Sequence, residues 1–153
     1  MDGFRPRGLM ARTALRQATG AIHERLHRAP PFLSLSHRQL SLTGYAALLS
    51  RLATFYLNVA RHLPIDPARL ALLEMDLAAV SAPSPQHLTW TAPAGKAERL
   101  GWRYVVDGSI FGGRVIHRQL DYLLGEGESG RGFFRGSPGA AGGWQQLGGG
   151  LER

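Results

Sequence analysis

The segment YVVDGSIFGG, residues 104–113, decides how the rest of the chain is interpreted. It lies within residues 96–124, which are helical in pattern, yet it brings three glycines into that stretch: Gly108, Gly112 and Gly113. A glycine inside a helix costs about 1 kcal/mol relative to alanine, so three together predict a kink or a close approach of another group to the backbone. Because Gly108 and Gly112 are four residues apart, they form one stripe without side chains, on which a flat ligand could pack.

Helical periodicity also marks three earlier segments, and no strand pattern competes with it. We expect helices over 12–28, capped by Thr13 and ended by Pro30-Pro31; over 43–62, capped by Thr43; and over 66–80, with Pro67 in the first turn. We expect connectors over 32–42 and 81–95, and a glycine-rich segment after Gly125 that Phe133, Phe134 and Trp144 anchor. The predicted fold is all-α, a single compact multi-helix domain.

The domain is expected over residues 12–147, between a flexible N-terminal arm (1–11) and a flexible C-terminal tail (148–153). Hydrophobic residues make up 44% and charged residues 19%, an ordinary globular balance. No apolar run approaches the length of a membrane span, and the first ten residues lack the apolar core of a secretory signal, so we expect a cytoplasmic protein without membrane insertion.

The absence of cysteine excludes disulfides, zinc–thiolate sites, iron–sulfur clusters and thiolate ligation of haem. Any metal must therefore be held by histidine, carboxylate or tyrosine. The net charge of +7 favours an acidic partner, but the basic residues are scattered. Because no clustered basic helix or aromatic stacking motif is present, nucleic acid is not expected as a partner.

The first helix carries the candidate metal ligand, His23. At 100° per residue, His23 lies beside the apolar stripe of that helix and can face a partly buried crevice. Arg16 is nearly two turns earlier on the same side, about 10 Å away along the axis. This separation would suit a ligand with a coordinating centre and an anionic edge.

These segments together resemble the haem oxygenase family, in the form found in bacterial members. TGAIHERL (19–26) is similar to the proximal helix of that family, LTGYAALL (42–49) with Phe55-Tyr56 to its second helix, and residues 104–113 to its kinked distal helix. Phe133-Phe134 followed by Trp144 is similar to a later segment. The resemblance covers roughly residues 12–147, in the right order and without large gaps.

The resemblance implies oxidative cleavage of haem b to biliverdin, with release of iron and carbon monoxide. Molecular oxygen would be the co-substrate, a ferredoxin or a reductase the electron donor, and a phytochrome a possible recipient of biliverdin. It also implies that His23 is the axial iron ligand and that Arg16 contacts a haem propionate, with Thr19 in the same helix. Gly108, Ser109 and Gly112 would form the catalytic distal face, and Phe111 and Gly113 would also border the haem.

Alternatives remain for the protein and for its residues. Ser109 stands where many family members have an aspartate, which keeps open a non-catalytic or weakly active haem-binding protein of the same fold. A third hypothesis is that the protein is a basic helical adaptor that binds no haem. His23 could be a half-buried structural residue, His27 could compete with it as the ligand, and Gly108 and Gly112 could simply permit tight helix packing.

Overall fold

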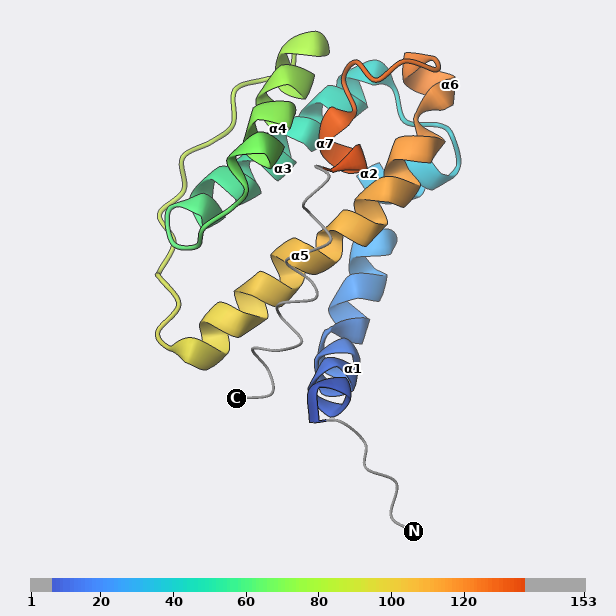
Figure 1. The fold of residues 1–153 in the computed structure, drawn as a ribbon. Helices are drawn as coiled ribbons and strands as arrows, with labels where there is room; N and C mark the ends of the chain where they lie inside the picture. Colours follow the sequence, from blue (N-terminus) through green and yellow to red (C-terminus); the bar gives the residue numbers. More distant parts are fainter. Residues whose placement is uncertain (1–6, 137–153) are drawn as a thin grey trace.

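The computed structural model describes residues 7–136, with side chains from residue 13 onward, and in this range it contains helices and no strand (Figure 1). The helices are α1 (Arg7–His27), α2 (Pro30–Ser36), α3 (Leu42–Ala60), α4 (Pro67–Ala79), α5 (Lys96–Gln119), α6 (Asp121–Leu124) and α7 (Gly132–Arg135). The predicted all-α class and the single compact helical domain are confirmed.

Helix α3 supplies the centre of the core. Its apolar residues recur every three to four positions, and Tyr45, Leu49 and Ala53 are completely buried. The helix packs beside α4, to which a short turn connects it (Figure 1). Asp66 caps α4 by accepting a hydrogen bond from the amide of Ala68, and Pro67 occupies the first turn, as the sequence predicts.

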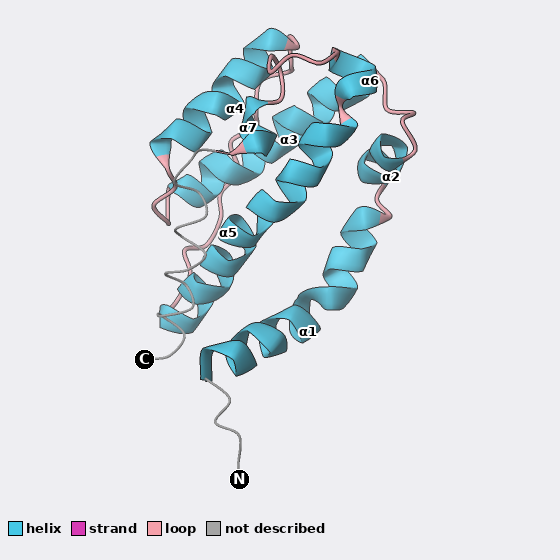
Figure 2. Cartoon of the chain, turned by 45° about the vertical axis from the view of Figure 1, so that its right-hand side comes forward, coloured by secondary structure: helices cyan, strands magenta, loops and turns pink. Residues whose placement is uncertain are grey.

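Helix α5 crosses the molecule as one unbroken helix of 24 residues (Figure 2). The three internal glycines do not interrupt it. Of the two predicted alternatives, a kink or a close approach of another group to the backbone, the structure shows the second at Gly113, where the backbone of Phe134 comes close. Val106 and Ile110 are buried on its inner face, and Leu120 is buried just beyond its end. Burial of this apolar face offsets the low helix propensity of the glycines.

The segment after Gly125 is held against the core, although its sequence is rich in glycine. Phe133 and Phe134 are buried in α7, which packs against both α4 and α5. Asp76 of α4 accepts hydrogen bonds from the amides of Gly132 and Phe133 at 2.9 and 2.7 Å, and so holds the start of α7. The predicted anchoring by the two phenylalanines is confirmed, whereas Trp144 and the predicted tail lie outside the described residues.

Several predicted boundaries are wrong. Helix α1 begins at Arg7, five residues before the predicted start at residue 12. The expected connector over 32–42 contains most of α2, because Pro30-Pro31 not only ends α1 but also forms the first turn of the next helix. The cap of α3 is Ser41 and not Thr43, since the Ser41 hydroxyl oxygen accepts the amide of Gly44 at 3.1 Å.

Residues 81–95 form the predicted loop without helix or strand, and side chains of α3 hold it. The Asn58 side-chain oxygen accepts the amide of Leu88, and the Thr54 hydroxyl accepts the amide of Gln86. In the part of the chain that the structure describes, no helix is long and apolar enough to cross a membrane.

Candidate functional site

Residues 104–113, which resemble the distal helix of the haem oxygenase family, lie within α5 and have two different faces. Val106, Ile110 and Gly113 point toward the core and are buried. At 100° per residue, Gly108 and Gly112 lie on roughly the opposite side of the helix. The side-chain-free stripe therefore faces away from α3 and α4.

This outward face of α5 is apolar, and among the described residues it is open at Gly112. A Cβ atom added at Gly112 would meet no heavy atom within 4 Å in the described part of the chain. Val105, Phe111 and Val115, which border the stripe, are all exposed. Tight helix packing would bring other atoms onto the stripe, so the open space at Gly112 argues against that explanation for this glycine.

Gly113 has a different surrounding from its neighbour. A Cβ atom at this position would lie 3.0 Å from the backbone oxygen of Phe134. The residue thus allows α7 to approach α5 closely, and it does not share the stripe formed by Gly108 and Gly112. The resemblance implies that Gly113 borders the haem, whereas in the structure Gly113 lies in the contact between α5 and α7.

Helix α1 carries the other half of the predicted site. His23 and Arg16 are both exposed, and two apolar residues near His23, Ile22 and Leu26, are 66% and 51% exposed. The ring of His27 contacts that of His23 edge to face, with centroids 4.5 Å apart. Thr19 donates its hydroxyl hydrogen to the carbonyl of Leu15 within the helix.

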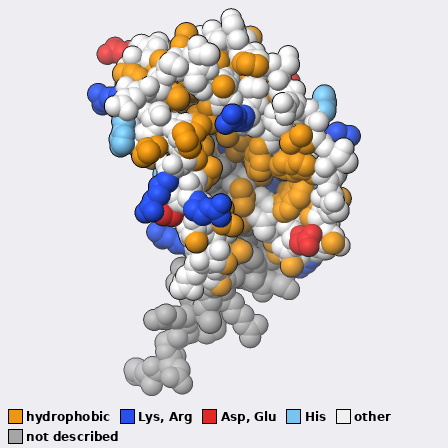
Figure 3. Space-filling model, turned by 180° about the vertical axis from the view of Figure 1, so that it is seen from behind, with side chains coloured by type: hydrophobic (Ala, Val, Ile, Leu, Met, Phe, Trp, Pro, Cys, Tyr) orange, Lys and Arg blue, Asp and Glu red, His pale blue; other side chains and the backbone are white. Residues whose placement is uncertain are grey.

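Helix α1 lies on the opposite side of α5 from α3 and α4, as both ribbon views show (Figures 1 and 2). Two helices thus carry exposed apolar side chains on the same side of the molecule. Seen from behind, the surface has apolar side chains gathered around a hollow, with basic side chains near it (Figure 3). The predicted residues of α1 and α5 thus lie on helices that share one side of the α3–α4 pair, and α1 itself packs mainly against α2.

Ser109 takes part in a buried hydrogen-bond network that we call the Arg69 cluster: Tyr56, Arg69, Val106 and Ser109. The Tyr56 and Ser109 hydroxyl oxygens are 2.6 Å apart, and Arg69 Nη2 donates to both, at 3.0 and 3.1 Å. Arg69 Nη1 and the Ser109 hydroxyl both donate to the carbonyl of Val106. Because the Ser109 hydrogen goes to Val106, the bridging hydrogen between the two hydroxyls must come from Tyr56.

Arg69 is the unusual member of this cluster, because its side chain is charged and the residue is only 4% exposed. No ion pair joins it to a carboxylate within the described residues, and its Nε has no hydrogen-bond partner there. The guanidinium carbon instead lies 4.7 and 4.8 Å from the ring centres of Tyr56 and Phe133. Contact with two aromatic faces offsets part of the cost of burying this charge.

Arg69 is not among the residues that the sequence predicts for the site, and Tyr56 appears there only as part of a motif. A signal was nevertheless present, since Arg69, Leu73 and Asp76 follow helical spacing along the buried face of α4. Two charged residues on an apolar stripe predict either a polar network or a functional group. Asp76 proves to hold α7, and Arg69 supports Ser109.

In the part of the chain that the structure describes, no three His, Cys, Asp or Glu residues gather as a multi-ligand metal site. A metal held by one axial imidazole, as in a haem site, does not need such a cluster. The remaining histidine on α5, His117, faces Glu128 at 3.2 Å and lies on the side of the helix away from the stripe. No protein-family model, no curated protein and no solved structure matches this chain.

Proposed function

We propose that this protein binds haem b between α1 and the outward face of α5, and that it is a biliverdin-producing haem oxygenase. The observation that supports the proposal most is the apolar stripe at Gly112, where the described residues leave open space on the side of α5 that is away from α3 and α4. Helix α1, which carries the exposed His23, lies on this side of α5. The motif resemblance assigns these two elements to the two faces of a haem.

The described residues fit a haem in three respects. His23 is an exposed imidazole, as an axial ligand must be before the metal binds. Ile22 and Leu26 on α1, with Val105 and Val115 on α5, leave apolar surface that a porphyrin would cover. Arg16 is exposed on α1, about 10 Å along the helix axis from His23, and can reach an anionic propionate.

Bound haem would itself supply the oxygen-activating metal and the carbon skeleton that is opened, with electrons from a ferredoxin or a reductase. The chain would orient the macrocycle and limit the space beside it. The absence of side chains at Gly108 and Gly112 would let a bound haem pack directly against α5. The Arg69 cluster fixes Ser109 and keeps a permanent positive charge behind this face of the helix.

One observation favours haem binding without turnover as the second candidate. The Ser109 hydroxyl donates to Val106 and accepts from both Tyr56 and Arg69, so its one hydrogen and both of its lone pairs are in use. In this arrangement Ser109 offers no hydrogen to a ligand or to an ordered water. Oxygenase activity therefore requires either a rearrangement of the cluster or a proton supply from water that does not involve Ser109.

A spectroscopic assay separates the two candidates. Haemin added to the purified protein should give a sharp Soret band, and ascorbate or a ferredoxin system in air should replace this band with the spectrum of biliverdin. A Soret band that persists under turnover conditions would favour the haem-binding protein. If haemin gives no saturable Soret change, neither candidate holds.

A further inference from the structure

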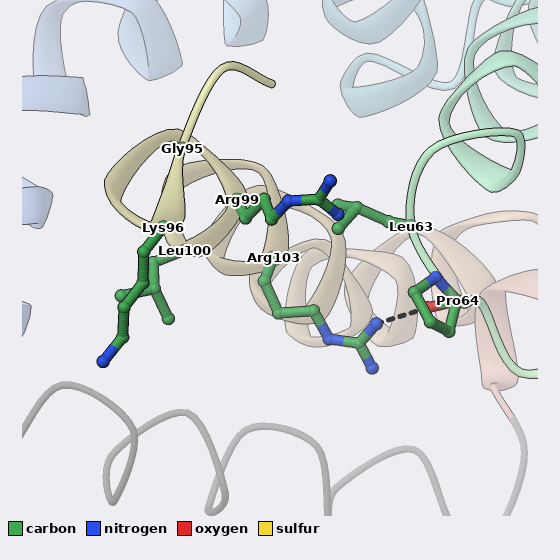
Figure 4. A pocket seen from close by; sticks show the side chains of 7 residues that line it. All are labelled: Leu63, Pro64, Gly95, Lys96, Arg99, Leu100 and Arg103. Carbon is green, nitrogen blue, oxygen red and sulfur yellow. Dashed lines mark hydrogen bonds between the residues drawn. The ribbon is translucent and has the colours of Figure 1, made fainter. Parts of the chain in front are cut away.

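A groove at the start of α5 combines an apolar floor with a basic rim (Figure 4). It has a volume of about 470 Å³ and lies between the first turns of α5 and the turn that joins α3 to α4. Leu63, Pro64 and Leu100 supply apolar surface, and Lys96, Arg99 and Arg103 supply the charge. At 100° per residue, the two arginines lie on the side of α5 opposite to the glycine stripe, so the groove is separate from the proposed haem site.

The charges of the rim are only partly neutralised. Arg103 pairs with Asp107 at 3.0 Å and also donates to the carbonyl of Pro64. Arg99 donates to the carbonyl of His62 over 3.5 Å, and among the described residues neither Arg99 nor Lys96 forms an ion pair. Figure 4 shows Arg99 and Arg103 extending toward Leu63 and Pro64, whereas Lys96 points away from these two residues. Two unpaired cations therefore remain at this end of the helix.

The geometry of the rim favours an elongated acidic ligand over a small ion. The three cations are three and four residues apart on one helix, so they span about 10 Å along its axis. Carboxylates at the same intervals on one face of another helix would match this line of charges. An inorganic anion would gain nothing from the apolar floor, whereas a leucine-type side chain of a protein partner would.

We propose that this groove docks an acidic amphipathic helix of a partner protein, with an apolar side chain over Leu63, Pro64 and Leu100 and carboxylates against Lys96 and Arg99. The complementarity of charge would increase the association rate and the apolar contact would slow dissociation. The proposal does not depend on haem binding.

The test uses the full chain and a labelled synthetic peptide in which glutamates and leucines occupy opposite faces of a short helix. Binding is measured by fluorescence anisotropy at low and at high salt. The test variant combines Lys96→Glu and Arg99→Glu, which place carboxylates in the first turn of α5, where they agree with the helix dipole. The matched control combines Arg114→Glu and Arg118→Glu on the same helix, with Arg118 about 22 Å along the axis from Arg103.

The proposal predicts that the groove variant weakens peptide binding about tenfold or more, that the control weakens it less than about threefold, and that salt reduces binding to the wild type. Leu100→Ala alone should weaken peptide binding at low and at high salt, because it removes part of the apolar floor. Circular dichroism verifies that each variant is folded. Equal losses in the two double variants, equal binding of a peptide of glutamates alone, or displacement of the peptide by duplex DNA at lower concentration than by unlabelled peptide would each overturn the proposal.

Discussion

At the residue scale, Gly112 and Gly113 are adjacent in sequence but have opposite surroundings. Gly112 faces open space, whereas a Cβ atom on Gly113 would press on the backbone oxygen of Phe134. Because a backbone atom cannot move aside as a flexible side chain can, the two alanine substitutions should have opposite effects on stability.

We expect Gly112→Ala to raise the free energy of unfolding by about 0.5–1 kcal/mol, since alanine is the better helix former. Gly113→Ala should lower it by about 1–3 kcal/mol, because the added methyl group forces α5 and α7 apart. Urea titration measures both values. In the haem proposal, Gly112→Ala should also weaken haemin binding although it stabilises the fold; a stabilised variant with unchanged haemin affinity would speak against a haem on this face.

Asp76 links stability to pH, because burial raises its pKa even though two backbone amides donate to it. With the folded-state pKa above the unfolded value, the folded protein holds this proton more tightly. The stability that protonated Asp76 contributes is fully present below the unfolded pKa and is lost as the pH rises through the folded pKa.

The advantage in unfolding free energy of the wild type over Asp76→Asn should therefore shrink as the pH rises from about 4, by about 1.4 kcal/mol for each unit by which the folded pKa is raised. Urea titrations across the pH range test this expectation. Glu74→Gln, at an exposed position on the same helix, is the matched control. An advantage that grows with pH would show that Asp76 is stabilised as the carboxylate.

The candidate site was predictable from the sequence only where its residues form local patterns. Helical spacing and the motifs point to His23, Arg16, Gly108 and Gly112. The Arg69 cluster could not be found in this way, because Tyr56 and Arg69 lie 53 and 40 residues before Ser109 in the chain. Only the packing of α3 and α4 against α5 brings the three side chains together.

At the element scale, long helices with strong apolar periodicity were predicted well, and short ones were missed. Helix α4 begins and ends within a residue of its prediction, whereas α2 and α7 have seven and four residues. Helices this short are unstable alone, and here tertiary contacts hold them. For α7 these contacts are Asp76 at its start and the burial of Phe133 and Phe134.

The start of α3 offers a test of a corrected boundary. Ser41→Ala should lower the unfolding free energy by about 1 kcal/mol, because the variant loses the hydrogen bond to the Gly44 amide. Thr43→Ala is the natural control, since Thr43 is exposed and lies inside the helix. Chemical denaturation measures the unfolding free energy of both variants. A larger loss of unfolding free energy in Thr43→Ala than in Ser41→Ala would show that Thr43 is the cap after all.

At the scale of the whole molecule, α1 stands apart from the core, because none of its described side chains is buried. Its described side chains are mostly exposed, and α2 is its main neighbour. Elements with few buried contacts open most easily, so α1 should be the first helix to yield to a protease. A ligand held between α1 and α5 would oppose this opening.

Trypsin should therefore cut first at Arg16 or Arg25, which are exposed on α1, or at Arg28, which is exposed just after it. Haemin in excess should slow these cleavages about tenfold or more, because binding stabilises the closed form by an amount that grows with the ratio of ligand concentration to Kd. Mass spectrometry of the fragments provides the readout. Protection elsewhere in the chain with unchanged cleavage of α1 would place the haem at another surface.

The central claim is that the imidazole of His23 on α1 holds a haem against the glycine stripe of α5, and a haemin titration with and without free imidazole tests it most directly. His23→Ala should lose the Soret spectrum of the wild-type complex and regain it when imidazole is added, while His27→Ala should keep the wild-type spectrum. If His23→Ala binds haemin with the wild-type spectrum, or if imidazole restores His27→Ala instead, the claim is contradicted.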